Sequence, residues 1–119
     1  MSEGTPLLTT TLEIARAAAG LLCATQADTD PVVRRGTKIA GARHIVQAAL
    51  TIAAPELRTL GLLTDGLHAA SMLVVAASPR YRRPALSQAV LAAAFAGAEL
   101  WTVRHHAAQH TRKRRCRRP

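Results

Sequence analysis

The stretch TLGLLTDGLHAASMLVVAASP, residues 59–79, decides how this chain is interpreted. Its only charged residue is Asp65, and seven of its residues are Leu or Val. On membrane-insertion scales a central Asp costs roughly 3 kcal/mol and each Leu or Val returns roughly 0.5 kcal/mol. Insertion into a bilayer therefore about breaks even, provided that Asp65 finds a polar partner inside a bundle of helices.

Three similar apolar blocks surround this stretch, and breaks rich in Pro, Gly and charge separate them. Each block is too long for an ordinary strand and rich in the helix formers Ala and Leu. Aromatic residues make up only 3% of the chain, which argues against a β-sandwich or barrel. The sequence therefore predicts an all-α four-helix bundle over residues 1–105, followed by a disordered basic tail over 106–119. The expected helices span about 7–27, 37–54, 57–78 and 84–105, and residues 28–36, 55–56 and 78–84 form the breaks.

The charge pattern favours a bilayer around these helices. The stretches 39–55, 59–79 and 84–103 carry one charged residue each, whereas a soluble bundle shows a charged stripe on every helix. Small residues recur four apart, as in Gly20 and Ala24, a spacing that brings helices close together in membranes. The longest charge-free stretches, 84–98 and 66–79, fall short of the usual 18 residues, so a soluble bundle remains the alternative.

Localisation follows from the same features. We expect a multi-pass protein of the cell membrane, and Trp101 would lie near an interface. Counting Lys and Arg on the two sides places both termini in the cytoplasm by the positive-inside rule. Residues 1–12 carry Glu3 and no basic segment, so we expect no secretory signal peptide.

Ionisable residues inside the blocks form the candidate site. Two interpretations stay open: a structural one, in which Arg43 pairs with Asp65 and Glu13 pairs with Arg16, and a polar pocket that binds a ligand or relays protons. The residues expected in the polar centre or pocket are Arg43, His44, Gln47, Asp65 and His68. The secondary polar residues are Glu13, Arg16 and Glu99.

Catalytic and metal motifs are weak in this chain. A single Asp65-x-x-His68 is an incomplete version of the motif pairs that hold di-iron centres in bundles. Haem or metal held by His44 and His68 is conceivable but is not our expectation, and we predict no cofactor. Neither a nucleophile motif nor a phosphate-binding loop occurs, which favours a protein without catalysis of its own. Two cysteines, Cys23 and Cys116, make no disulfide framework.

The C-terminal tail is strongly basic and contributes to a net charge of +9, from 16 Lys+Arg against 7 Asp+Glu. Such a run is commonly solvated, or it attracts anionic lipid headgroups, or it binds nucleic acid without specificity. The tail has no interleaved aromatic residues for base stacking, so lipid contact is favoured over nucleic acid. The residues concerned are Arg112, Lys113, Arg114, Arg115, Arg117 and Arg118.

The segments GARHIVQAAL, residues 41–50, and TDGLHAASML, residues 64–73, resemble a pattern in small actinobacterial proteins of unknown function. The resemblance covers about residues 7–103, and its specific parts are the Arg-His and Asp-x-x-His segments. It implies a membrane protein of about four helices and draws attention to Arg43, His44, Asp65 and His68. It implies no reaction, and the Arg-rich tail is not part of the pattern.

Three functions remain open at this stage. The first is an integral membrane protein that acts as a non-catalytic accessory, scaffold or self-assembling subunit, with a protein partner or further copies of itself. The second is a membrane protein that binds a small molecule or cofactor in its polar pocket. The third is a soluble basic helical protein that binds nucleic acid through its tail.

Overall fold

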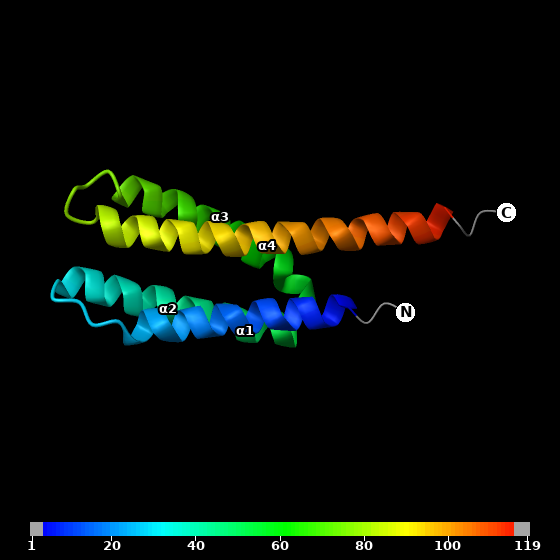
Figure 1. Ribbon diagram of the computed structural model, residues 1–119, viewed down its shortest axis with the longest axis horizontal. Coiled ribbons are helices and arrows are strands. Elements are labelled where there is room, and N and C mark those ends of the chain that lie inside the picture. Colours follow the sequence, from blue (N-terminus) through cyan, green and yellow to red (C-terminus); the bar gives the residue numbers. More distant parts are fainter. Residues whose placement is uncertain (1–3, 116–119) are drawn as a thin grey trace.

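Two antiparallel helical hairpins make up the fold (Figure 1). The computed structural model describes residues 4–115. Helices α1 (Gly4–Thr25) and α2 (Pro31–Ala53) form the first hairpin, and α3 (Arg58–Val75) and α4 (Arg82–Arg115) form the second. A short 3-10 turn, η1 (Pro55–Leu57), joins the hairpins. The prediction of an all-α fold with four helices is confirmed, and most contacts between helices lie within the hairpins.

Helix α2 starts earlier than expected. The sequence analysis treated residues 28–36 as a break, and that was wrong from Pro31 onward. Asp30 caps the helix, because its side chain accepts a hydrogen bond from the backbone N–H of Val32 at 2.9 Å. Pro31 follows as the first helical residue, where its fixed φ suits the helix and its missing N–H costs nothing. The Asp-Pro pair is therefore a start signal.

Helix α4 also runs further than expected, to Arg115. The sequence analysis ended this helix near His105 and predicted a disordered tail from residue 106. Between 104 and 115 the chain contains no Pro or Gly, and Ala, Gln, Lys and Arg are good helix formers. Nothing local therefore stops the helix there, and residues 116–119 lie outside the described part of the chain.

Close backbone approach holds the first hairpin together. A Cβ atom added at Gly20 in α1 would lie 2.7 Å from the carbonyl oxygen of Gly41 in α2, closer than such atoms pack. A Cβ at Gly41 would in turn lie 2.7 Å from the backbone nitrogen of Ala24. The expected small-residue spacing thus forms a helix contact here, whereas Gly66 and Gly97 face open space.

Apolar side chains are distributed in the reverse of the usual pattern. Among the described residues, the buried apolar ones are Cys23, Phe95 and alanines, with no Leu, Ile or Val. Large apolar side chains instead point outward on all four helices; Leu7 in α1 is 69% exposed, Ile39 in α2 71% and Val74 in α3 76%. The interior therefore offers little of the apolar burial that stabilises a soluble domain.

Within residues 4–115, two helical segments are long and apolar enough to cross a membrane, Leu7–Thr25 in α1 and Arg82–His105 in α4. The sequence analysis expected four such segments. Helix α2 falls short because it carries Arg34, Arg35, Lys38 and Arg43, and α3 is a helix of 18 residues that includes Arg58 and Asp65. Two candidate spans are weak support for a membrane location.

Candidate functional site

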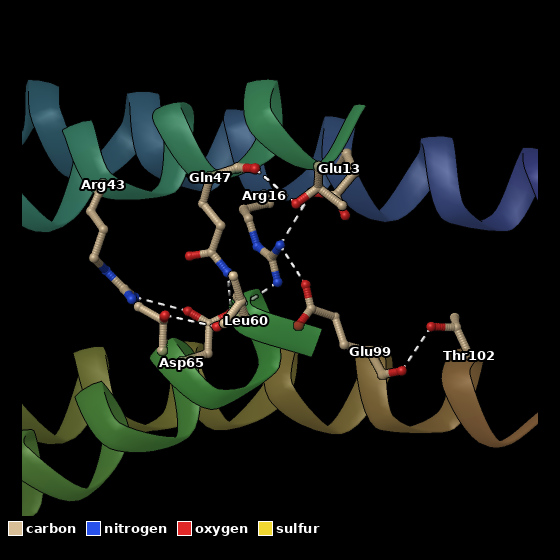
Figure 2. A network of polar contacts seen from close by, with 10 residues as sticks. Glu13, Arg16, Arg43, Gln47, Leu60, Asp65, Glu99 and Thr102 are labelled. Carbon is tan, nitrogen blue, oxygen red and sulfur yellow. Dashed lines mark hydrogen bonds and ion pairs between the residues drawn. The ribbon is translucent and has the colours of Figure 1, made fainter. Parts of the chain in front are cut away.

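Arg16 of α1 lies at the centre of a buried ionic cluster between the hairpins (Figure 2). Its Nη1 is 3.2 Å from Oε2 of Glu13 on the same helix, and 2.6 Å from Oε1 of Glu99 on α4. Its Nη2 donates a hydrogen bond of 2.9 Å to Oδ2 of Asp65 on α3. One guanidinium therefore joins carboxylates from three helices.

Asp65 receives more donors than the other carboxylates. Besides Arg16, the Nη2 group of Arg43 donates to its Oδ1 at 2.9 Å, and Nε2 of Gln47 donates to its Oδ2 at 3.2 Å. Arg43 and Gln47 are four residues apart on α2 and so lie on one face of that helix. The predicted Arg43–Asp65 pair between α2 and α3 is present, and so is the predicted Glu13–Arg16 pair within α1.

The ionic cluster, which comprises Glu13, Arg16, Arg43, Asp65 and Glu99, is almost free of solvent. Glu13 is 1% exposed, and Arg16, Asp65 and Glu99 are 0% exposed. Three carboxylates face the guanidiniums of Arg16 and Arg43, and the charge of Arg58 on α3 also acts on Glu13. Transferring such groups from water is costly unless they are paired, and here the pairing itself joins the hairpins.

Two aromatic side chains lie close to the ionic cluster. The guanidinium carbon of Arg16 lies 4.9 Å from the ring centroid of Phe95 on α4, within cation–π range. The buried ring of His44 on α2 lies 5.5 Å from the same Phe95 ring, at 52° to it. Phe95 therefore contacts both His44 and Arg16, and it gives the cation an apolar neighbour.

A second ionic contact ties the hairpins together at one end of the molecule. Nε and Nη2 of Arg80, in the connection between α3 and α4, donate to Oδ2 of Asp30 at 2.9 and 2.8 Å. The bonds from Arg80 and from the Val32 amide hold the pKa of the Asp30 carboxyl below its usual range. The same pairing raises the pKa of Arg80.

A cavity of about 410 Å³ lies between α2 and the second hairpin. Its walls are almost wholly apolar, and they include the first turns of α2 and α4 and the last turns of α3. Arg43, His68 and Gln88 supply polar groups to the lining. Nε and Nη1 of Arg43 and Nε2 of His68 are buried and have no hydrogen-bond partner in the structure.

The structure brings together most of the predicted site residues, but in different roles. Arg43, Gln47 and Asp65 lie in one network, while His68 lines the cavity and His44 packs against Phe95. The sequence analysis ranked Arg16 and Glu99 as secondary, yet Arg16 is the hub and Glu99 is one of its partners. A signal was available, because Arg16 is the only cation between residues 1 and 33.

The remaining site predictions are not resolved by geometry. Among the described residues, no group of three or more His, Cys, Asp or Glu side chains is placed to hold a metal ion. The backbone of residues 112–115 belongs to α4, whereas Arg117 and Arg118 lie outside the described residues. Cys23 is a free, buried cysteine whose Sγ lies 3.5 Å from Nε2 of Gln88.

Comparison of this chain with models of known protein families, with curated proteins and with solved structures finds no match.

Proposed function

We propose that this protein is a small integral membrane protein that acts as a non-catalytic accessory, scaffold or self-assembling subunit. The observation that carries the proposal is the inverted distribution of side chains. Four ionisable side chains of the ionic cluster are at most 1% exposed, while Leu, Ile and Val cover the outside. In water this arrangement forgoes apolar burial, but in hydrocarbon it places apolar groups against lipid and ionic groups against each other.

The dimensions are consistent with a bilayer. The candidate span in α1 has 19 residues, and at 1.5 Å per residue it is about 28 Å long, close to the roughly 30 Å hydrocarbon core. Helix α1 begins and α4 ends on the same side of the molecule (Figure 1). An arrangement with both ends of the chain in the cytoplasm, as the positive-inside rule predicts, belongs to the same proposal.

The contacts that the buried polar groups make between helices support a scaffolding role. The hydrogen bonds of Arg16 and Asp65 join α1, α2 and α3 to one another, and the ion pair with Glu99 adds α4. Such groups determine which helix faces meet. The resemblance to small actinobacterial four-helix membrane proteins forms part of this proposal, as does contact of the basic tail with anionic headgroups.

Fractionation of cells that express the full chain tests the membrane location. We expect the protein in the membrane pellet, retained after an alkaline carbonate wash and released by a nonionic detergent. Recovery as a monomer from the cytosol would contradict the proposal. Recovery from the cytosol as a large assembly would indicate that further copies of the chain, rather than lipid, cover the apolar surface. Salt-sensitive recovery with nucleic acid would favour the third function.

A matched pair of variants sharpens this test. Ile14 is 61% exposed on α1, and Ile14→Lys places a charge where lipid would lie. Insertion scales put the cost of a central Lys at roughly 3 kcal/mol, whereas exposed substitutions in water change stability by about 0.5 kcal/mol or less. The control is Gln26→Lys, at an exposed position after α1. We expect Ile14→Lys to lose membrane recovery and Gln26→Lys to keep it; equal recovery of both would count against a bilayer.

Binding of a small molecule is the second candidate function. The cavity between α2 and the second hairpin, with its unpartnered polar atoms, is the specific observation that favours it.

A further inference from the structure

The cavity between α2 and the second hairpin is open to the outside of the molecule. Three of the apolar residues in its lining, Val32, Ile39 and Val75, are each exposed over at least 40% of their surface. Its volume of about 410 Å³ falls within the roughly 300–1,000 Å³ of small-molecule pockets. In a bilayer, an apolar recess that opens outward is reached from the hydrocarbon, where the apolar molecules are lipid chains.

The inner end of the cavity presents carbon rather than polar atoms to an occupant. Arg43 and His68 line this end, but Nε and Nη1 of Arg43 and Nε2 of His68 are buried. The Nη2 group of Arg43 is already bonded to Asp65. A charged head placed here would lose its water without gaining a partner, whereas an alkyl chain has nothing to lose.

Positive charge gathers at the outer end of the cavity, next to the first turn of α2, where the α1–α2 and α3–α4 connections lie (Figure 1). Arg35 is exposed on α2, three residues after Val32 and four before Ile39, so it shares a helix face with both lining residues. Arg82 is exposed on α4, three residues before the lining residue Ala85. The basic residues at this end are Arg34, Arg35, Lys38, Arg80, Arg82 and Arg83, and the acidic ones are Asp28 and Asp30.

The distance between the two ends matches one leaflet of a bilayer. Val32 and Arg43 are 11 residues apart on α2, which is about 16 Å at 1.5 Å per residue. Half of the roughly 30 Å hydrocarbon core is about 15 Å. A lipid whose phosphate lies at the first turn of α2 therefore has an acyl chain long enough to reach Arg43. Arginine is well suited to the phosphate, because its planar guanidinium donates two parallel hydrogen bonds to such a group.

We propose that the cavity binds an anionic phospholipid from the leaflet opposite the chain ends. The phosphate lies between Arg35 and Arg82, and one acyl chain runs along the apolar walls with its methyl end near Arg43. The inference rests on the proposed membrane location, since the bilayer supplies the lipid. It concerns a different site from the basic tail, which lies at the other end of the molecule (Figure 1).

Gly36 provides a variant that fills the cavity without a clash. It lines the cavity, and a Cβ atom added there meets nothing within 4 Å. A leucine at this position extends into the space that the acyl chain needs. Gly66 is the matched control, because its added Cβ also meets nothing within 4 Å and it does not line the cavity.

A second pair of variants tests the phosphate contact. The double variant Arg35→Gln/Arg82→Gln removes two charges that share helix faces with the lining. Its control, Lys38→Gln/Arg83→Gln, removes two exposed charges at the same end of the molecule. Lys38 and Arg83 are each two residues away from lining residues on either side, a spacing that places them on the opposite faces of α2 and α4.

The test uses the full chain in nonionic detergent, with dioleoyl phosphatidylglycerol and dioleoyl phosphatidylcholine as probes and native mass spectrometry as the readout. We expect one phosphatidylglycerol per chain in the parent and in Gly66→Leu, and at least tenfold weaker binding in Gly36→Leu. Phosphatidylcholine should bind the parent at least tenfold more weakly. This preference should disappear in Arg35→Gln/Arg82→Gln and persist in Lys38→Gln/Arg83→Gln. Circular dichroism establishes that each variant keeps its helices.

Four outcomes would overturn the inference. A parent that retains neither lipid has no such site, and phosphatidylglycerol that binds equally to Gly36→Leu and Gly66→Leu does not occupy the cavity. A preference that falls equally in both double variants reflects diffuse charge rather than a phosphate contact. A dimer that is lost only in Gly36→Leu, without lipid adducts, shows that a second copy fills the cavity. A chain that stays in the membrane pellet but retains no lipid refutes this inference alone, whereas a cytosolic chain refutes the proposed function.

Discussion

Replacing Arg16 with Met should destabilise the protein strongly at neutral pH and much less at acidic pH. Arg16 contacts Glu13, Asp65 and Glu99 at 3.2, 2.9 and 2.6 Å. Methionine has a similar length but no charge, so the variant leaves three carboxylates with Arg43, and with Arg58 near Glu13, as the remaining cations. The response that costs the least free energy is the uptake of one more proton by the folded state.

The magnitude follows from this extra proton. For a glutamate with an ordinary pKa of about 4.3, neutralisation at pH 7 costs about 3.7 kcal/mol, at 1.36 kcal/mol per pH unit. This value agrees with the roughly 3–5 kcal/mol lost when one partner of a buried pair is removed. The folded variant binds one more proton than the unfolded chain, so its stability falls as the pH rises. Between pH 7 and pH 5 the penalty should shrink by about 2.7 kcal/mol.

Unfolding in detergent micelles, followed by circular dichroism at pH 7 and pH 5, measures both quantities. Arg35→Met is the control, because Arg35 is exposed on α2 and such substitutions change stability by about 0.5 kcal/mol or less. If Arg16→Met and Arg35→Met unfold at the same midpoint, Arg16 does not hold the hairpins together. A penalty that is the same at both pH values would refute the protonation argument.

Three further predictions concern separate parts of the fold. Glu99→Gln removes the buried ion pair between Arg16 and α4, so the variant should lose roughly 3 kcal/mol of unfolding free energy; a loss of less than about 1 kcal/mol would mean that this ion pair does not hold the helices together. Gly20→Val should cost about 1–3 kcal/mol by overpacking against α2, while Gly97→Ala, in open space, should be neutral or raise the melting temperature. Asp30→Asn should reduce stability near neutral pH but not in acid, because a carboxyl with a lowered pKa stabilises above its unfolded value and loses that effect as the pH falls through the folded one. The stability of Arg80→Gln should depend on pH in the same way as that of Asp30→Asn. If both variants show the pH dependence of the parent, the Asp30–Arg80 contact contributes nothing to stability.

Much of the secondary structure could be predicted from local patterns. Apolar blocks and the breaks between them located four helices, and a single Asp in an apolar stretch signalled a buried partner on another helix. The errors in the helix boundaries occur where the same residues are compatible with two local structures. Pro31 after Asp30 reads either as a break or as a capped helix start, and a run of Arg and Lys reads either as a tail or as a continued helix.

The candidate site was predictable only in part. Pairing of Arg43 with Asp65 followed from the scarcity of ionic residues in adjacent helices, and Glu13 with Arg16 followed from their spacing. The joining of both pairs into one cluster depends on how the hairpins pack, since Arg16 and Asp65 are 49 residues apart in the chain. Sequence spacing carries no information about that distance.

The sequence alone determined the composition of each helix face, because helical propensity and the rarity of charged residues are local properties that do not depend on the other helices. Only the tertiary structure decided which faces meet, and hence that Arg16 serves three carboxylates and that apolar side chains cover the outside. The cavity is likewise a property of packing. Residues of α2, α3 and α4 that are far apart in the sequence form its walls, and local patterns carry no information about their proximity.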